Sequence, residues 1–296
     1  MGNDPGEIIK MVFQLIGEGR AGENLLNVLL GIRPKDVAVV AQGAEDYPPA
    51  KTLVRYAGNP LLSPIKEHPW ESKYALNTSA FRVKDRVYLL YRAYGDDEVS
   101  RIGLAVTDGH NVLERLPEPV FVPQDRTEKK GVEDPRVTII DNKIFMLYTA
   151  YDGVIAQIAA AAIGLDDLLN KRFDKWERKG LAFQDIWDKD AILLPDKING
   201  KYIIYHRIEP SIWMAHLDQL KFPAPKIEHS IILGPRSGLM WDSLKIGAGS
   251  QPIKTKYGWL PIAESGPLSR NRVRDREGRG DLGAECCLHL RRGAGS

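Results

Sequence analysis

The sequence predicts an all-β protein built from repeated strand units, a β-propeller, with a short helical extension at its N-terminus. Three segments share one design, a polar turn, an apolar strand, a tyrosine and then polar residues: "KDRVYLLYRAYGD", "DNKIFMLYTAYDG" and "INGKYIIYHRIEP". Their tyrosines, Tyr91, Tyr148 and Tyr205, are separated by 57 and again by 57 residues. This spacing suits a four-stranded blade of about 40–50 residues plus its loops. A β-sandwich with coincidental spacing is the alternative, but two equal spacings in succession favour the propeller.

Residues 1–52 carry a helical pattern instead. Asp4 can cap a helix, Pro5 suits the first helical position, and Glu7 follows the cap by three residues. Apolar residues then recur at helical spacing, first at Ile8, Ile9, Val12, Phe13 and Ile16 and again at Leu25, Leu26, Val28, Leu29 and Leu30. We expect a helical hairpin or an oligomer contact here, so a homo-oligomer formed through these helices is one expectation.

The composition excludes several classes of function. The 296 residues include 41 Lys and Arg against 39 Asp and Glu, so no general binding of nucleic acid is implied. No apolar run reaches the roughly 18–20 residues that a membrane span requires. The cysteines are the adjacent Cys286 and Cys287, which excludes a disulfide framework and a zinc-ligand array. Because the N-terminus also lacks the layout of a signal peptide, we expect a cytoplasmic protein without a metal site.

The C-terminal part breaks the repeat. "KTKYGWL", residues 254–260, opens a fourth unit on schedule, but residues 261–296 contain seven arginines and six glycines with no lysine and no Phe, Trp or Tyr. Such a composition cannot supply the core of a blade. A natural flexible basic tail and a reading frame altered after Leu260 both explain it, and the abrupt loss of lysine favours the second. We therefore divide the chain at residues 52 and 260, with the propeller over 53–260 and its last blade incomplete.

Charged residues gather at the predicted strand ends. "GVEDPR", residues 131–136, places Glu133 and Asp134 next to a proline and an arginine. A simple turn would explain this hexapeptide, and a proton donor held at a strand end is the alternative. On an extended strand the two acids point in opposite directions. Equivalent positions of the other units carry Arg92, Arg101, Lys189, His206 and Arg207, which together would form a pocket for a small anion such as phosphate.

A resemblance to a known family rests on these segments in their order. "NTS", "YR", "GVEDPR", "YTAYDG", "KDAILLP", "YHR" and "KIGAGSQPIKTKYGWL" make the chain resemble glycoside hydrolase family 130, the mannoside phosphorylases, which are five-bladed β-propellers. The likeness covers roughly residues 53–260. The chain departs from the family after "GWL", because the aromatic and histidine that continue this strand in the family are absent.

The resemblance implies an activity and a set of site residues. The implied reaction is inverting phosphorolysis of β-1,2- or β-1,4-linked mannosides to α-mannose 1-phosphate, with inorganic phosphate as co-substrate and no other cofactor. It makes Asp134 the general acid, acting through a sugar hydroxyl, and burial is expected to raise its pKa. Phosphate would be held by Arg92, Lys189, His206 and Arg207, and the sugar would be contacted by Asn77, Ser79, Arg101, Glu133, Asp152 and Lys245.

Two other functions remain open at this point. A hydrolase of the same family needs a second catalytic carboxylate to activate water, and the retained cations argue against it. A propeller that only binds sugar has no need of a buried acid beside an anion pocket. The missing part of the last blade would expose sheet edges in either case.

Overall fold

The computed structural model describes residues 56–225, 229–236, 243–255, 258–266 and 287–288. The chain divides into two compact units, residues 1–57 and 58–296. The helical extension expected over residues 1–52 and most of the Arg- and Gly-rich tail lie outside the described residues. The description below concerns the second unit.

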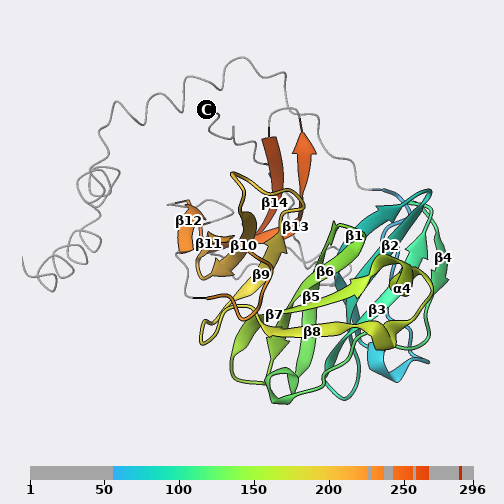
Figure 1. Ribbon diagram of the computed structural model, residues 1–296. Coiled ribbons are helices and arrows are strands. Elements are labelled where there is room, and N and C mark those ends of the chain that lie inside the picture. Colours follow the sequence, from blue (N-terminus) through green and yellow to red (C-terminus); the bar gives the residue numbers. More distant parts are fainter. Residues whose placement is uncertain (1–55, 226–228, 237–242, 256–257, 267–286, 289–296) are drawn as a thin grey trace, which may run out of the picture. The chain divides into compact units, whose positions relative to one another are not determined.

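The second unit consists of antiparallel meanders that follow one another along the chain (Figure 1). The first contains β1 (Tyr74–Val83), β2 (Arg86–Tyr94), β3 (Ser100–Thr107) and β4 (Val112–Arg115). The second contains β5 (Gly131–Ile140), β6 (Lys143–Tyr151), β7 (Ala156–Gly164) and β8 (Glu177–Leu181). The third contains β9 (Lys189–Leu193), β10 (Tyr202–Ile208), β11 (Ser211–Leu217) and β12 (His229–Leu233). The fourth contains β13 (Lys245–Thr255), β14 (Gly258–Gly266) and β15 (Cys287–Leu288).

The prediction of an all-β protein is confirmed. The helical segments among the described residues are the short α4 (Leu165–Leu169) and the single 3-10 turns Pro69–Glu71, Arg126–Glu128 and Phe173–Lys175. The first two meanders join through one parallel residue pair, Ser100 with Gly131. The first strands of the four meanders, β1, β5, β9 and β13, are neighbours in that order. The strand pairings of the described residues do not close into a ring, so the propeller and its blade number stay predictions.

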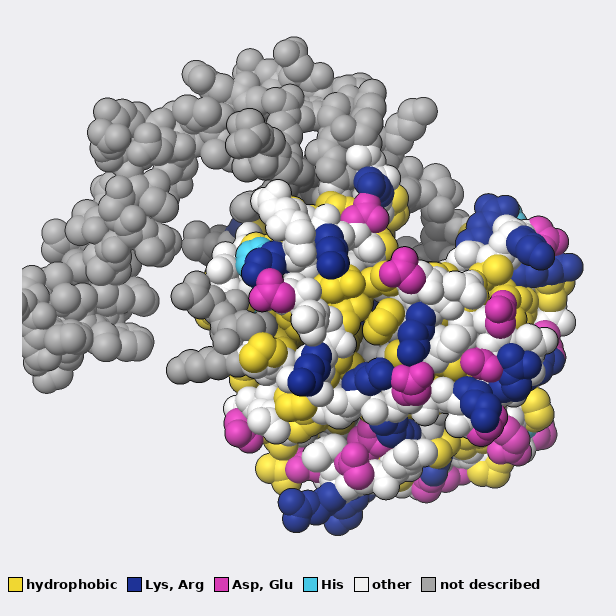
Figure 2. Space-filling view, in the orientation of Figure 1, with side chains coloured by type: hydrophobic (Ala, Val, Ile, Leu, Met, Phe, Trp, Pro, Cys, Tyr) yellow, Lys and Arg dark blue, Asp and Glu magenta, His cyan; other side chains and the backbone are white. Residues whose placement is uncertain are grey.

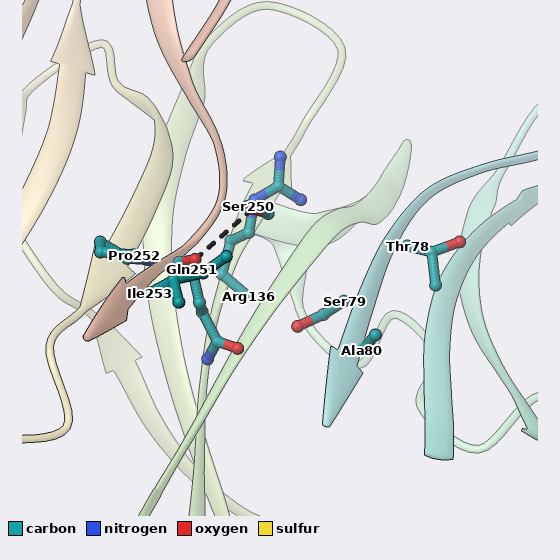
Figure 3. A pocket seen from close by; sticks show the side chains of 8 residues that line it. All are labelled: Thr78, Ser79, Ala80, Arg136, Ser250, Gln251, Pro252 and Ile253. Carbon is teal, nitrogen blue, oxygen red and sulfur yellow. Dashed lines mark hydrogen bonds between the residues drawn. The ribbon is translucent and has the colours of Figure 1, made fainter. Parts of the chain in front are cut away.

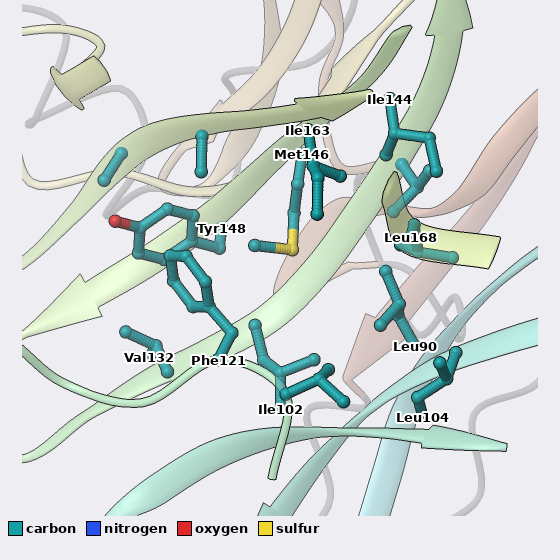
Figure 4. Packing of buried hydrophobic residues seen from close by; sticks show 14 of the residues in the cluster. Leu90, Ile102, Leu104, Phe121, Val132, Ile144, Met146, Tyr148, Ile163 and Leu168 are labelled. Carbon is teal, nitrogen blue, oxygen red and sulfur yellow. The ribbon is translucent and has the colours of Figure 1, made fainter. Parts of the chain in front are cut away.

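Hydrophobic side chains fill the spaces between neighbouring meanders. Successive residues of β6 point to opposite faces, as a strand requires. Met146 and Tyr148 pack into a cluster with side chains of the first meander, whereas Leu147 packs against the third. Figure 4 shows the first cluster, in which Phe121 meets the ring of Tyr148 edge-on at a centroid distance of 5.0 Å.

Two of the three repeated tyrosines, Tyr91 and Tyr148, belong to a buried hydrogen-bonded triad that occurs twice. The Tyr91 hydroxyl donates to Glu71 Oε2 at 2.8 Å, and Arg115 binds both Glu71 and, at 3.0 Å, the tyrosine oxygen. In the second meander the Tyr148 hydroxyl donates to Glu128 Oε1 at 2.6 Å, and Arg178 donates to both oxygens of Glu128. Both glutamates are almost fully buried, where a carboxylate needs such partners. Burial is also the main cause that raises the pKa of both tyrosines.

The fourth meander continues beyond the change in composition at residue 260. β14 pairs with β13 as far as Gly266, opposite Lys245. Ala263 is buried in a cluster with Ile246 and Ile212. The domain boundaries at residues 52 and 260 stay predictions.

The surface of the described part carries charges of both signs, and its helices are short. Lys and Arg side chains lie interspersed with Asp and Glu on the face shown in Figure 2, in keeping with the balanced composition. None of the described helices has the length and apolar character needed to cross a membrane.

The triad predicts a stability difference between two tyrosines of one strand. Tyr148→Phe removes a donor from the buried Glu128, so we expect the free energy of unfolding to fall by about 1–3 kcal/mol. Tyr151→Phe is the matched control, because the Tyr151 hydroxyl donates only to the exposed carbonyl of Gly153, and a change below about 0.5 kcal/mol is expected. Urea denaturation measures both. Equal losses in the two variants would contradict a structural role for the triad.

Candidate active site

The site begins with three polar residues in an unusual backbone conformation. Asn77 on β1, Asp134 on β5 and Asp190 on β9 have φ values of +49°, +52° and +53°. Asparagine and aspartate tolerate this left-handed region better than other residues with a Cβ atom. The three positions follow one another by 57 and 56 residues, so they are equivalent positions of successive first strands. Strand pairing shifts register around all three, on β1 between Leu76 and Ser79, on β5 between Glu133 and Arg136, and on β9 between Lys189 and Ile192. Such shifts are typical of a β-bulge, which re-aims the side chain of the extra residue.

Asp134 lies in a network of hydrogen bonds that joins three meanders. Its Oδ1 accepts from Asn77 Nδ2 at 2.6 Å and from an Arg92 nitrogen at 3.2 Å. Arg92 also donates to Glu133 Oε1 at 2.7 Å, and Lys189 donates to Glu133 Oε2 at 3.1 Å. The adjacent acids are only 4% and 6% exposed. The guanidinium of Arg92 thus binds two buried acids at once.

This arrangement corrects one expectation from the sequence. Glu133 and Asp134 were expected to point in opposite directions, as neighbours on an extended strand do. Both reach Arg92 instead, because the left-handed backbone of Asp134 turns its side chain out of the regular alternation.

The expected rise in the pKa of Asp134 is also wrong for this structure. Burial is the largest single influence and raises the pKa. The charges of Arg92, Arg136 and Lys189, together with the hydrogen bond from Asn77, outweigh burial. The pKa of Asp134 therefore lies below its ordinary value.

A second buried ion pair lies on the neighbouring strands. Arg207 on β10 lies 2.7 Å from Asp190 Oδ2, and both residues are less than a tenth exposed. Burial raises the pKa of Asp190, although Arg207 and Arg136 oppose this shift and Asp134 adds to it. Gly247 on β13 backs the pair, since a Cβ atom there would lie 2.6 Å from Asp190 Oδ2. Asp190 was not among the predicted site residues. Its position one repeat step after Asp134 is the signal that could have indicated it.

His206 lies between two polar side chains, the buried Asp188 and the half-buried His229. Its Nδ1 lies 2.7 Å from Asp188 Oδ2 and its Nε2 lies 2.8 Å from His229 Nδ1. His206 has no exposed surface, and the ring of Phe183 packs against both histidines. Burial raises the pKa of Asp188, and burial together with His206 lowers that of His229. Phosphate could reach His206 only if one of these contacts opened.

The other residues that were predicted to contact sugar differ in their surroundings. Ser79 follows Asn77 by two residues on β1 and is buried. Its oxygen accepts a hydrogen bond from the Val137 N–H at 2.9 Å. Arg101 pairs with Asp97 at 2.6 Å, and Asp152 accepts two backbone N–H groups of its own loop. Lys245 pairs with Glu209 at 3.0 Å, and Glu209 lies 3.9 Å from Arg207. Among the described residues, Arg101 and Asp152 thus make local contacts, whereas Lys245 is linked to Arg207 through Glu209.

A cavity of about 370 Å³ lies between β1, β5 and β13 (Figure 3). Its lining comprises Thr78, Ser79, Ala80, Arg136, Ser250, Gln251, Pro252 and Ile253. Arg136 is the charged member and is only 4% exposed. Arg136 is the arginine of the "GVEDPR" segment, and the neighbouring Glu133 binds Arg92 and Lys189.

A buried acid ringed by cations, set on the first strands of successive β-meanders, is a site suited to acid-assisted chemistry on an anionic or polyhydroxylated substrate. The model of the β-1,4-mannooligosaccharide phosphorylase family, glycoside hydrolase family 130, matches residues 65–270. The chain belongs to this family.

Individual relatives agree with this assignment. The chain is 37% identical to a 1,2-β-oligomannan phosphorylase of Thermoanaerobacter sp. (strain X514) over 71% of this chain and 70% of that protein. It is 38% identical to a β-1,2-mannobiose phosphorylase of the same organism, over 71% of each. The solved structure of the β-1,2-mannobiose phosphorylase from Listeria innocua has a similar fold, with a TM-score of 0.59 at 24% identity over 72% of this chain and 75% of that one.

The close approach at Gly247 predicts the effect of one added methyl group. Gly247→Ala places a Cβ atom 2.6 Å from Asp190 Oδ2 and 2.8 Å from an Arg207 nitrogen, so the buried pair must move. We expect the free energy of unfolding to fall by about 1–3 kcal/mol. Gly234→Ala is the control, because its nearest contact would be an ordinary 3.5 Å to Ser211. Thermal unfolding compares the two, and an unaffected Gly247→Ala variant would show that the pair is not tightly packed.

The shared guanidinium predicts a pH-dependent loss of stability. A carboxyl with a lowered folded pKa stabilises the protein above its unfolded pKa, and this contribution is lost as pH falls through the folded pKa. Arg92→Met leaves Glu133 and Asp134 short of their cation, so we expect a loss of about 3–5 kcal/mol at pH 7. The loss should shrink as the pH falls below about 4 and through the lowered folded pKa of Asp134, where this carboxyl becomes protonated. Urea denaturation across this pH range, with the exposed Arg82→Met as control, measures it. A loss that does not change with pH would contradict the arrangement.

Proposed function

We propose that this chain catalyses the inverting phosphorolysis of β-mannosides. Inorganic phosphate is the co-substrate, and the products are α-mannose 1-phosphate and a shortened sugar. The observation that carries the proposal is the buried carboxyl of Asp134 held by Asn77 and Arg92, with Lys189 bound to the neighbouring acid. Membership of the family and the phosphorylase names of the relatives support it. Both β-1,2 and β-1,4 linkages fall within the proposal.

The proposed chemistry requires one protein acid rather than two. An inverting hydrolase uses a second carboxylate as the base that activates water. Phosphate is already an anion, so its oxygen can form the bond to the anomeric carbon as the bond to the leaving oxygen breaks. The leaving oxygen takes a proton from Asp134 through a sugar hydroxyl, and the carboxylate regains a proton from solvent before the next turnover.

The low pKa of Asp134 fits an acid that phosphate activates. Arg92, Arg136 and Lys189 stabilise the carboxylate and so oppose its protonation. A phosphate dianion bound among these cations adds negative charge beside Asp134 and raises its pKa. The acid therefore becomes able to donate when the nucleophile is in place.

Roles for the surrounding residues follow from their contacts. Arg92, Lys189 and Arg207 are proposed phosphate ligands, whereas His206 would join them only after leaving Asp188 or His229. Asn77 and Glu133 are proposed to orient the sugar, since both border Asp134. Ser79, Arg101, Asp152 and Lys245 stay predictions as sugar contacts.

We also propose that the meanders are blades of a five-bladed β-propeller. The order β1, β5, β9 and β13 along neighbouring first strands supports this, since the inner strands of propeller blades follow one another in such an order. The oligomer contact of the N-terminal segment and the cytoplasmic location stay predictions.

Release of sugar phosphate tests the proposed function directly. With short β-mannosides, we expect mannose 1-phosphate from the full chain only when inorganic phosphate is present. Asp134→Asn should lower the rate by about 100-fold or more, because it removes the general acid. Asp85→Asn is the charge-matched control, since Asp85 is 78% exposed.

The other outcomes are equally definite. Free mannose formed without phosphate would indicate hydrolysis in place of phosphorolysis. Sugar binding with no product under either condition would indicate a binding protein. Full activity in Asp134→Asn would show that another residue donates the proton.

A further inference from the structure

The cavity between β1, β5 and β13 is lined by a cation, Arg136, that no described carboxylate contacts directly. Arg136 is 4% exposed, and among the described residues it forms no ion pair with a carboxylate. Its guanidinium donates to the carbonyl of Pro135 at 3.2 Å, and its buried Nε has no partner in the described part of the chain. A buried charge without a close counter-ion is costly.

The other cations of the site are already engaged. Arg92 binds Glu133 and Asp134, Lys189 binds Glu133, and Arg207 binds Asp190. An incoming anion must share each of these residues with a protein carboxylate. Arg136 forms no such ion pair among the described residues.

The position of Arg136 relates the cavity to the proposed reaction. Arg136 follows Asp134 by two residues on β5, as Ser79 follows Asn77 on β1. The charge of Arg136 acts on both Asp134 and Asp190, although neither carboxylate pairs with it. Figure 3 shows Arg136 between the Ser250–Ile253 segment of β13 and Ser79 and Ala80 of β1.

Hydroxyl groups in the cavity add donors suited to an oxyanion. The Ser79 oxygen accepts from the Val137 N–H, which leaves its own hydrogen available to donate. Ser250 reaches only the Gln251 carbonyl, at 3.4 Å. The cavity lining thus combines one guanidinium with hydroxyl groups, both of which are donors used in phosphate recognition.

We propose that Arg136 is the first contact of inorganic phosphate in the cavity between β1, β5 and β13. Phosphate binds the Arg136 guanidinium with help from the Ser79 hydroxyl, and from there it competes with the carboxylates for Arg92 and Lys189. This inference rests on the proposed phosphorolysis and adds to it a residue and a cavity for the co-substrate.

Direct binding of phosphate tests the inference without requiring turnover. The full chain is titrated with inorganic phosphate by calorimetry, beside Arg136→Met, Arg136→Lys and the exposed control Arg82→Met. We expect Arg136→Met to weaken binding by about 10- to 100-fold, the loss of a charge-assisted contact. Arg136→Lys should bind with intermediate affinity because it keeps the charge but loses the planar fork, and Arg82→Met should match the unchanged chain.

The KM for phosphate gives a second readout. Arg136→Met should raise the KM for phosphate much more than the KM for the mannoside, which a purely structural role would not separate. If Arg136→Met does not fold, Arg136→Lys decides, since an unchanged affinity for phosphate in that variant would overturn the inference.

Several results would overturn it in the folded variants. These are unchanged phosphate binding in Arg136→Met, an equal loss in Arg82→Met, and no binding of phosphate by the unchanged chain. Phosphorolysis with an unchanged KM for phosphate in Arg136→Met would reject the role of Arg136 and leave the proposed function standing. Phosphate binding that depends on Arg136, in a chain that shows no phosphorolysis, would support the role of Arg136 and reject the proposed function.

Discussion

The guanidinium of Arg92, shared by Glu133 and Asp134, is the interaction on which the site depends. Two adjacent carboxylates are buried near the start of β5, and neither could stay ionised there without close cations. Arg92 binds one oxygen of each, and Lys189 binds the second oxygen of Glu133. The left-handed conformation of Asp134 makes this sharing geometrically feasible, because it brings the two acids to one side. The strained backbone and the ion-pair network thus stabilise each other.

The repeat that organises the fold serves structure at one position and chemistry at another. At the tyrosine position, Tyr91 and Tyr148 hold buried glutamates in equivalent triads, so the tyrosine marks scaffold rather than site. At the bulge of the first strand, equivalent positions carry Asn77, Asp134 and Asp190, and the next repeat step reaches Gly247. One backbone conformation therefore presents an amide, an acid with a lowered pKa and an acid with a raised pKa. Environments that separate the pKa values of neighbouring acids are a common basis for functional division between them.

The sequence could predict the repeat and the all-β fold, because apolar periodicity and equal spacing are local or regular signals. It also singled out Arg92, Asp134 and Lys189, which the structure places in one network, while their roles stay predictions. It could not predict that Glu133 and Asp134 point the same way, since a positive φ at an aspartate follows from strand pairing with β6. The sign of the pKa shift at Asp134 depends on a balance between burial and three cations, and that balance requires coordinates. His206 was expected beside phosphate on the strength of its position, yet Asp188 and His229 occupy both of its ring nitrogens. The helical extension predicted for the N-terminus and most of the C-terminal tail lie outside the described residues.

The central claim is that phosphate and Asp134 compete for the same cations, so that binding of the nucleophile turns a carboxylate into a proton donor. The direct measurement is the pKa of the Asp134 carboxyl, followed by ¹³C NMR with and without inorganic phosphate and assigned with Asp134→Asn. We expect a pKa below the ordinary aspartate value in the absence of phosphate and a clear rise when phosphate is bound. A pKa that phosphate leaves unchanged or lowers, in a chain that binds phosphate, would contradict the account.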